Sequence, residues 1–405
     1  MSLTSINIHV YLHLYLHTVK LLTRDLDQKG ERNVEGYFDY AATCPMDEDA
    51  LEAYVHATRH YFANTKSLHD SGTKAHALLD QCRNTIADLL GIEREGVYFT
   101  SGGTESNELA LDALLKAGKG RHIITTEAEH SSVRNLIQRC EEEGYKVTRV
   151  PLNEKGMVHV EDVARAIQED TVLMAIQHVN SDIGTVQPIR ELSNLCRAHG
   201  ILFHSDCVQS FGKMALEEVA PYVDSLSVSS HKLYGPKGVG AVYIRPSLSF
   251  HPKTPGGTHE GGVRAGTVNT PGIAGFTVAA EKMVKERSRI ESKIVQLKKT
   301  FLEAGEWRLV GDTADSSVPI IGLLLPEIEG QWAMLEGNRR DFHFSTGSAC
   351  RTGSQGPPGT LLAMGCDAEE AKSFIRLSFS HEQTNEQVEK LALFLNELHK
   401  PTVAK

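Results

Sequence analysis

Residues 98–107 read YFTSGGTESN, and this stretch decides how the chain on either side of it is interpreted. An apolar run from Gly96 to Thr100 is typical of a short β-strand, and residues with helical spacing follow from Asn107 to Ala117. The turn at Gly102-Gly103-Thr104 would leave free N–H groups at the positive end of a helix dipole, where a phosphate binds well. A tight turn before a capped helix gives the same pattern, so the stretch alone is a weak signal. It is not a Walker A motif, because no Gly-Lys-Ser/Thr follows.

Outward from this stretch, strand-like apolar runs alternate with segments of helical period such as Glu161–Gln168. This alternation predicts an α/β fold with a parallel sheet that is covered by helices on both faces. Ligands bind outside the carboxyl ends of the strands in such sheets, so the residues after each strand are candidates for a site. The other predicted strands are His122–Thr126, Lys146–Pro151, Val172–His178, Ile201–Asp206, Ser225–Ser230 and Ala241–Arg245.

The composition is that of a soluble globular protein. The chain has 405 residues, 40% hydrophobic and 23% charged, a length expected for two or three domains. A net charge of -10 argues against nucleic acid as the main partner, because phosphate contacts need clustered basic residues. No apolar run reaches the roughly 18 residues that span a bilayer. We therefore expect a cytoplasmic protein with neither nucleic-acid nor membrane partners.

Two parts of the chain differ from the α/β pattern. Within residues 1–36, apolar and polar side chains alternate from Ile6 to His17, which predicts a strand. This extension lacks the features of a signal peptide, and we assign it no function. A long charged helix is predicted from Ala280 to Gly305, and beyond it a smaller α+β domain. Gly and Pro cluster at 252–272 and 353–359, which predicts loops. The elements of the smaller domain are the strands Val318–Leu325 and Phe374–Phe379 and the helix Gln387–Leu398.

Two polar residues at predicted strand ends carry recognisable chemistry. Asp206 could cap the next helix or act as a ligand. Lys232 follows a buried strand, where an ammonium is costly and tends to lose its proton, and a neutral lysine can form a Schiff base. An anion site, a carboxylate and a lysine on one parallel sheet together fit pyridoxal 5'-phosphate, which needs all three.

With these residues in place, the sequence resembles the cysteine desulfurases of the NifS/IscS group in the class-V aminotransferase family. The resemblance runs from about Tyr37 to about Leu398. The matching motifs are YFDYAATCP (37–45), FTSGGTESN (99–107), EHSSV (129–133), HSDCVQSFGK (204–213), SSHKLYGPKGVGA (229–241), GGTHEGGVRAGT (256–267), STGSAC (345–350) and IRLSFS (375–380).

The resemblance implies a fold-type-I pyridoxal-phosphate enzyme that acts as a homodimer. Its large domain, residues 51–285, would hold a mostly parallel seven-stranded sheet between helices. Residues 37–50 would join the small α+β domain, residues 286–400, which would carry the loop of a catalytic cysteine. The motifs HSDCVQSFGK, LEGNRR and STGSAC also resemble those of one bacterial subgroup of these enzymes. That subgroup supplies sulfur to the iron–sulfur cluster of quinolinate synthase in NAD biosynthesis.

The resemblance also implies a role for each matched residue. Lys232 would form the Schiff base and move the Cα proton of L-cysteine, and His130 would stack on the cofactor ring and assist. Arg376 and Asn64 would bind the substrate carboxylate. Contacts to the ring would come from Asp206, Gln209 and Asn180, and contacts to the phosphate from Gly103, Thr104, Ser229 and His231, with Thr267 reaching the phosphate of the neighbouring subunit.

Cys350 is the predicted nucleophile among the seven cysteines, which include no CxxC pair and no zinc spacing. It lies between Gly- and Ser-rich stretches, which predicts an exposed mobile loop, and the resemblance implies that it receives sulfur as a persulfide and passes it to an acceptor protein. The other six are expected to be inert packing residues, and we predict no metal site. Cys44 lies near the active-site entrance by analogy, and Cys207 is expected to pack in the core.

The sequence departs from the family pattern at two site positions. Ser181 stands where an asparagine near the ring hydroxyl is usual, so that contact is lost, taken over by water, or supplied by Asn180. Asn64 lies in a stretch, Ala63-Asn-Thr-Lys66, that differs from the usual Gly-Asn-Pro-Ser. Two other functions stay open: a class-V aminotransferase or selenocysteine-type lyase, which needs no nucleophile at 350, and a non-catalytic iron–sulfur assembly scaffold.

Overall fold

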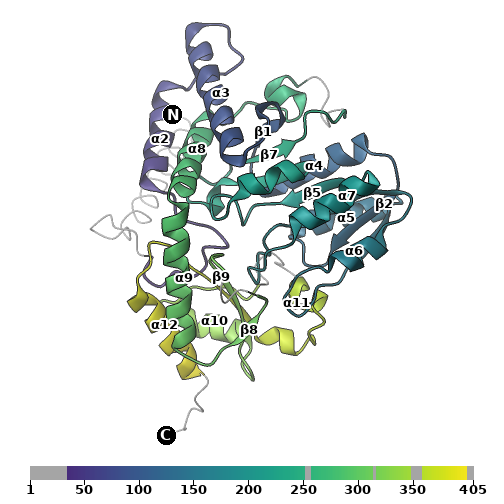
Figure 1. Cartoon of the computed structure of the whole chain (residues 1–405). Helices are drawn as coiled ribbons and strands as arrows, with labels where there is room; N and C mark the ends of the chain where they lie inside the picture. The colour runs from purple at the N-terminus through teal and green to yellow at the C-terminus, as the bar shows by residue number, and fades with distance from the viewer. Residues whose placement is uncertain (1–33, 251–256, 313–315, 348–357, 399–405) are drawn as a thin grey trace, which may run out of the picture. The chain divides into compact units, whose positions relative to one another are not determined.

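The computed structural model describes residues 34–250, 257–312, 316–347 and 358–398, so the extension at 1–33 and the predicted nucleophile Cys350 lie outside the described residues. Two sheets organise the described part of the chain: one of seven strands in the order β1-β7-β6-β5-β4-β2-β3, and one of three strands in the order β10-β9-β8 (Figure 1). No helix of the described residues is long and apolar enough to cross a membrane.

The seven strands of the large sheet all coincide with predicted strands to within a few residues. They are β1 Val97–Thr100, β2 His122–Thr126, β3 Lys146–Val150, β4 Thr171–Ala175, β5 Leu202–Asp206, β6 Ser225–Ser229 and β7 Gly240–Ile244. Strands β2, β4 and β5 pair in parallel with their neighbours, whereas β7 runs antiparallel to both β1 and β6. The predicted mostly parallel seven-stranded sheet is therefore confirmed, with β7 as its antiparallel member.

Helices cover both faces of this sheet because successive strand residues point to opposite sides. Ile123 and Leu173 pack with α4 and α5 in one hydrophobic cluster, whereas the next residues, Ile124 and Met174, pack in another cluster with side chains of α6 and α7. The bounds of these helices are α4 Gly103–Ala117, α5 Ser131–Glu142, α6 Val160–Ala166 and α7 Ile189–His199. The predicted α/β sandwich is confirmed.

Two helix predictions need correction. The single charged helix expected from Ala280 is the end of α8, Thr270–Lys285, followed by a separate helix α9, Arg287–Glu303. Helix α8 begins inside the segment that was predicted to be a loop, because the Asn269 side chain caps it by accepting the N–H of Gly272. A proline in the first helical turn fits there, since its missing N–H has no intrahelical acceptor to reach. Helix α2, Glu48–His60, packs against α8 (Figure 1).

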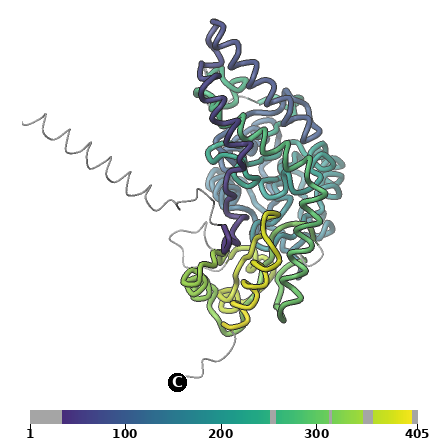
Figure 2. The backbone as a smooth tube through the Cα atoms, turned by 90° about the vertical axis from the view of Figure 1, so that its left-hand side faces the viewer, coloured from purple at the N-terminus to yellow at the C-terminus, as the bar shows by residue number. Residues whose placement is uncertain are grey.

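The second sheet forms the smaller α+β region, as predicted. Strands β9, Ile320–Leu324, and β10, Phe374–Ser378, coincide with the two predicted strands, and β8, Arg308–Val310, is a third strand that the sequence did not indicate. Helix α12, Asn385–Leu398, lies beside α9 (Figures 1 and 2). The remaining helices of the described chain are α3 Asp70–Leu90, α10 Gly330–Arg339 and α11 Gly359–Ala363, with short 3-10 turns between elements.

The segment after residue 36 joins the edge of the small sheet. Tyr37 forms a bridge with His343, and Asp39 forms one with Ser378 of β10. The chain then turns toward the large sheet, where the N–H of Cys44 donates to the carbonyl of His231. The division into domains at 51–285 and 286–400 stays a prediction.

Candidate active site at the carboxyl ends of the strands

The N-terminus of α4 and the end of β6 form a cradle for an anion. Gly102 precedes α4 with φ 147°, a conformation open to glycine, and a Cβ there would lie 3.7 Å from Ser229 Oγ. Ser229 Oγ is buried and has no hydrogen-bond partner among the described residues. Gly103 and Thr104 open the helix, where backbone N–H groups have no intrahelical acceptor, so these donors and the Ser229 hydroxyl meet at one place. A phosphate fits this donor set.

Asp206 lies beside this cradle at the end of β5, where only 7% of it is exposed. Its Oδ2 accepts from Asn107 Nδ2 at 2.8 Å, and its Oδ1 accepts the N–H of Val208 at 3.0 Å. The Asn107 amide is held by donors on its other side, since Oδ1 accepts from Ser227 and from His204 Nε2. Burial lowers the pKa of His204 to about 4, so its ring is neutral at pH 7 and donates from one nitrogen. Asn107 thus aims its amide group at the Asp206 carboxylate.

A chain of hydrogen bonds connects Asp206 with His130. Asn107 Nδ2 also donates to Ser132 Oγ at 2.9 Å, and Ser132 Oγ lies 2.8 Å from His130 Nδ1. His130 is the cap of α5, and its Nδ1 accepts the N–H of Ser132. A neutral ring therefore carries its proton on Nε2. The structure brings His130, Asp206 and the cradle together at one edge of the sheet.

Lys232 stands in the short turn after β6, and its amine meets the segment that follows Asp39. Nζ donates to the carbonyls of Ala41 at 2.6 Å and Ala42 at 2.7 Å. Gln209 Nε2 donates to the same Ala41 carbonyl at 2.9 Å, and Gln209 Oε1 accepts from the buried Lys213. The two predicted residues Lys232 and Gln209 thus share one acceptor.

Burial lowers the pKa values of two basic side chains near Lys232. His231, whose Nδ1 lies 3.0 Å from Thr43 Oγ1, has its pKa lowered to about 4 by burial and then by the nearby Lys232. Burial also lowers the pKa of Lys213. His231 is therefore neutral at pH 7 beside Lys232.

Asn180 and Ser181 form a turn rather than an open contact. Asn180 Oδ1 accepts the N–H groups of Asp182 and Ile183, and its Nδ2 donates to the Ala128 carbonyl and to Thr360. Both ends of the amide are engaged within the protein, so a contact of Asn180 with a cofactor ring stays a prediction.

Arg376 is a buried cation on β10, with 6% exposure. Its Nη2 pairs with Asp39 Oδ1 at 2.8 Å, and its Nη1 donates to the Ser181 carbonyl at 3.0 Å. The two other residues predicted near the substrate or the phosphate, Asn64 and Thr267, are exposed, and no contact between described residues joins them to Arg376 or the cradle. Asn64 Oδ1 accepts the N–H of Lys66 in the loop between α2 and α3. The structure does not bring these two residues into the site of their own chain.

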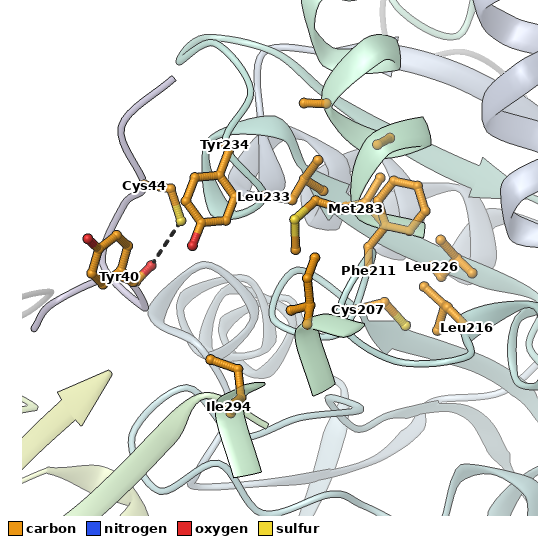
Figure 3. Close-up of a cluster of buried hydrophobic side chains, with 14 of the residues drawn as sticks. Tyr40, Cys44, Cys207, Phe211, Leu216, Leu226, Leu233, Tyr234, Met283 and Ile294 are labelled. Carbon is orange, nitrogen blue, oxygen red and sulfur yellow. Dashed lines mark hydrogen bonds between the residues drawn. The ribbon is translucent and has the colours of Figure 1, made fainter. Parts of the chain in front are cut away.

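The described cysteines are packing residues, as predicted, and their positions correct one expectation. Cys44 is buried instead of lying at an entrance, and its Sγ lies 3.5 Å from the carbonyl oxygens of Tyr40 and Lys232. Figure 3 shows its contact with Tyr40. Backbone pairing of its N–H with the His231 carbonyl turns it inward. Cys207 packs among apolar side chains in the same cluster, and burial raises its pKa to about 12. Burial raises the pKa of Cys44 too, so neither is a ready nucleophile.

Four residues of the site had no role in the sequence interpretation: Asp39, Asn107, Glu129 and Lys213. All four stand inside quoted motifs, which was the available signal. Glu129 is fully buried, and its carboxylate accepts from Thr126 Oγ1 at 2.8 Å and from the N–H of Gln177 at 2.9 Å. Burial, with a smaller contribution from the Asp206 charge, raises the pKa of Glu129 from 4.5 to about 8.

The buried Glu129 predicts a pH-dependent stability. Between about pH 4.5 and 8 the folded protein keeps a proton on Glu129 that the unfolded chain has released, so the free energy of unfolding falls as pH rises. In Glu129→Gln the neutral amide can donate to Thr126 and accept from Gln177. We expect the Tm of this variant relative to wild type to rise across that window, by at least about 2 °C, and then to level off. Thermal melts at a series of pH values test this, and a constant difference would contradict it.

The chain matches a known protein family along most of its length. The family model of the class-V aminotransferases, "Aminotransferase class-V", matches residues 36–391, and the chain belongs to this family. A Bacillus subtilis (strain 168) protein with the provisional name cysteine desulfurase NifS is 46% identical over 364 residues, 88% of this chain and 92% of the relative. The cysteine desulfurase IscS of Dictyoglomus turgidum is 36% identical, covering 87% of this chain and 92% of its own.

Solved structures of similar proteins share the fold of this chain. A NifS-like protein superposes with a TM-score of 0.83 at 30% identity, covering 89% of this chain and 98% of its own. SspA in complex with cysteine gives a TM-score of 0.76 at 32% identity, covering 86% of this chain and all of that one (100%). The predicted resemblance to the NifS/IscS group and the fold it implied are therefore confirmed.

Proposed function

We propose that this protein is a cysteine desulfurase that converts L-cysteine to L-alanine and keeps the sulfur as a persulfide on Cys350. The observation that carries the proposal is the meeting of Lys232, Asp206 and the anion cradle of α4 at one edge of the sheet. Similarity to cysteine desulfurases along most of the chain supports the choice of substrate.

Pyridoxal 5'-phosphate would be held at this edge. The Ser229 hydroxyl, which has no partner within the described part of the chain, and the α4 N-terminus suit its phosphate. The Asp206 carboxylate, oriented by Asn107, suits a protonated ring nitrogen. Further contacts would come from Gly103, Thr104, His231, Gln209, Asn180 and His130. When bound, the cofactor supplies an electron sink that makes the Cα proton of an amino acid removable.

The chain's own groups would then position the substrate and move a proton. Arg376 would bind the substrate carboxylate with its planar fork of donors, with Asn64 assisting. Lys232 Nζ would take the Cα proton and later return a proton as a general acid, and His130 would assist it.

Cys350 would complete the reaction as the nucleophile. Its thiolate would attack the Sγ of the bound cysteine, so that an S–S bond forms and the C–S bond of the substrate breaks. Cysteine and the Cys350 thiol give alanine and a Cys350 persulfide, and no outside oxidant or reductant is consumed. The terminal sulfur would then pass to an acceptor protein for iron–sulfur cluster assembly, with the quinolinate synthase of NAD biosynthesis as a specific candidate.

The proposal includes an assembly and a location. Thr267 is exposed and would reach the phosphate of a neighbouring subunit, which requires a homodimer. The large domain, 51–285, would hold the cofactor, and the small domain, 286–400, would carry Cys350 and Arg376. We place the enzyme in the cytoplasm.

The deciding experiment counts products. The purified protein, supplied with pyridoxal 5'-phosphate and L-cysteine but no thiol reductant, should form one alanine per persulfide in its first turnover, with the added sulfur on the Cys350 peptide by mass spectrometry. L-serine, which lacks the sulfur, is the matched control. Alanine with released elemental sulfur and no modified Cys350 would favour a lyase, and protein that takes up no visible-absorbing cofactor would favour a scaffold. Reconstitution of apo quinolinate synthase tests the acceptor.

A further inference from the structure

Arg376 already holds a carboxylate within its own chain. The Asp39 side chain is 19% exposed and that of Arg376 only 8%, and their ion pair measures 2.8 Å between Nη2 and Oδ1. The same Oδ1 also accepts the hydroxyl of Ser345 at 2.9 Å. The proposed substrate would present a carboxylate to a guanidinium that an internal carboxylate has already bound.

Backbone pairing fixes both Asp39 and Ser345 on the open edge of β10. Asp39 bridges to Ser378, two residues along the strand, and the Phe38 carbonyl accepts the N–H of Ser378 at 2.8 Å. Ser345 bridges to Arg376 itself, with main-chain hydrogen bonds of 2.7 and 3.2 Å. Asp39 is therefore anchored by its main chain, independently of the ion pair.

The pair leaves part of the guanidinium available. A guanidinium has five N–H donors in one plane. Asp39 and the Ser181 carbonyl each take one, on different nitrogens, and Nε is buried without a hydrogen-bond partner among the described residues. A buried donor without a partner is costly, so this nitrogen points to a missing acceptor. The guanidinium therefore keeps N–H donors for a second carboxylate while Asp39 stays bound.

We infer that Asp39 is a positioning residue that sets the plane of Arg376 for the carboxylate of an α-amino acid substrate. This inference rests on the proposed function. A long arginine side chain loses conformational entropy when it binds a ligand. An Arg376 side chain that Asp39 already holds loses less of this entropy on binding substrate. The acceptor oxygen, rather than the negative charge, carries this role, because a hydrogen bond to Oδ1 is enough to fix the plane.

Three variants test the inference by steady-state kinetics of alanine formation. Asp39→Ala should raise KM for L-cysteine about tenfold, with kcat changed by less than about threefold. Asp39→Asn keeps an oxygen at the position of Oδ1 and should keep KM within about threefold of wild type. Ser345→Ala, which removes the other bond to that oxygen, is the matched control and should change KM by less than about twofold. The affinity for the non-reacting product L-alanine, read from cofactor absorbance, should weaken in parallel with KM.

The outcomes separate this inference from the proposed function. A wild-type protein that makes no alanine from L-cysteine refutes the proposed function. A working wild type beside Asp39→Ala with unchanged KM refutes only the role of Asp39, and so does Asp39→Asn that behaves like Asp39→Ala. If Asp39→Ala does not fold, Asp39→Ser, which is polar but too short to reach Arg376, carries the same expectation.

Discussion

Replacement of Lys232 with alanine is expected to lower kcat for alanine formation from L-cysteine by about 1,000-fold or more, roughly 4 kcal/mol of barrier. Lys232 is the lysine that the fold delivers to the carboxyl ends of β5 and β6, where Asp206 also stands. Its Nζ is held by the carbonyls of Ala41 and Ala42, within the same group of contacts as Gln209. The other lysine near it, Lys213, is buried and bonded to Gln209, so it is not free to take over the proton transfer.

A spectroscopic readout keeps this prediction independent of turnover. Borohydride reduction of the wild-type protein with pyridoxal 5'-phosphate should fix the cofactor on the peptide that contains Lys232, and Lys232→Ala should carry no such modification. Lys237→Ala, at an exposed lysine of the same segment, is the matched control and should stay within about twofold of wild type. Substantial activity in a folded Lys232→Ala protein, or reduction onto another lysine, would contradict the assignment.

The sequence predicted the site best at the carboxyl ends of the strands, where a parallel sheet brings polar residues together. A buried parallel strand appears as an apolar run, so β4 and the apolar start of β5 indicated strands, and the polar residues that end β5 stood out. Asp206 and Lys232 were found in this way. The length of the connection before β7 also indicates the direction of this strand. Residues 230–239 are too few for a parallel crossover, which takes a dozen or more, so β7 must run antiparallel to β6.

Contacts between distant segments were beyond reach of pattern alone. Asp39 and Arg376 are 337 positions apart, and only the pairing of both segments with one edge of β10 brings them together. Asn107 was inside a quoted motif, but its four hydrogen-bonding partners come from β5, β6 and the first turn of α5. The helical spacing of residues around Asn107 cannot identify these four partners, because they come from other elements.

Replacement of Cys350 with alanine is expected to abolish persulfide formation and to lower alanine production from L-cysteine by at least about 100-fold, nearly 3 kcal/mol of barrier. The reason is that sulfur must leave the substrate onto a thiolate, and the cysteines of the described chain are poor candidates. Burial raises the pKa of Cys196 and Cys207 to about 12 and that of Cys140 to about 11, and it raises those of Cys44 and Cys82 as well. A protonated, enclosed thiol is neither nucleophilic nor accessible.

Cys366 supplies the matched control for Cys350, because it is the one cysteine of the described residues that is partly exposed. Burial still raises its pKa, and it packs at the edge of a small apolar cluster away from Lys232 and Asp206. Cys366→Ala should therefore keep alanine production within about twofold of wild type. Mass spectrometry after incubation with L-cysteine should locate sulfur on Cys350 in both the wild type and this control. Undiminished alanine production by Cys350→Ala would contradict the role of Cys350 and favour a lyase of the family, since a lyase needs the lysine and the carboxylate but no thiol.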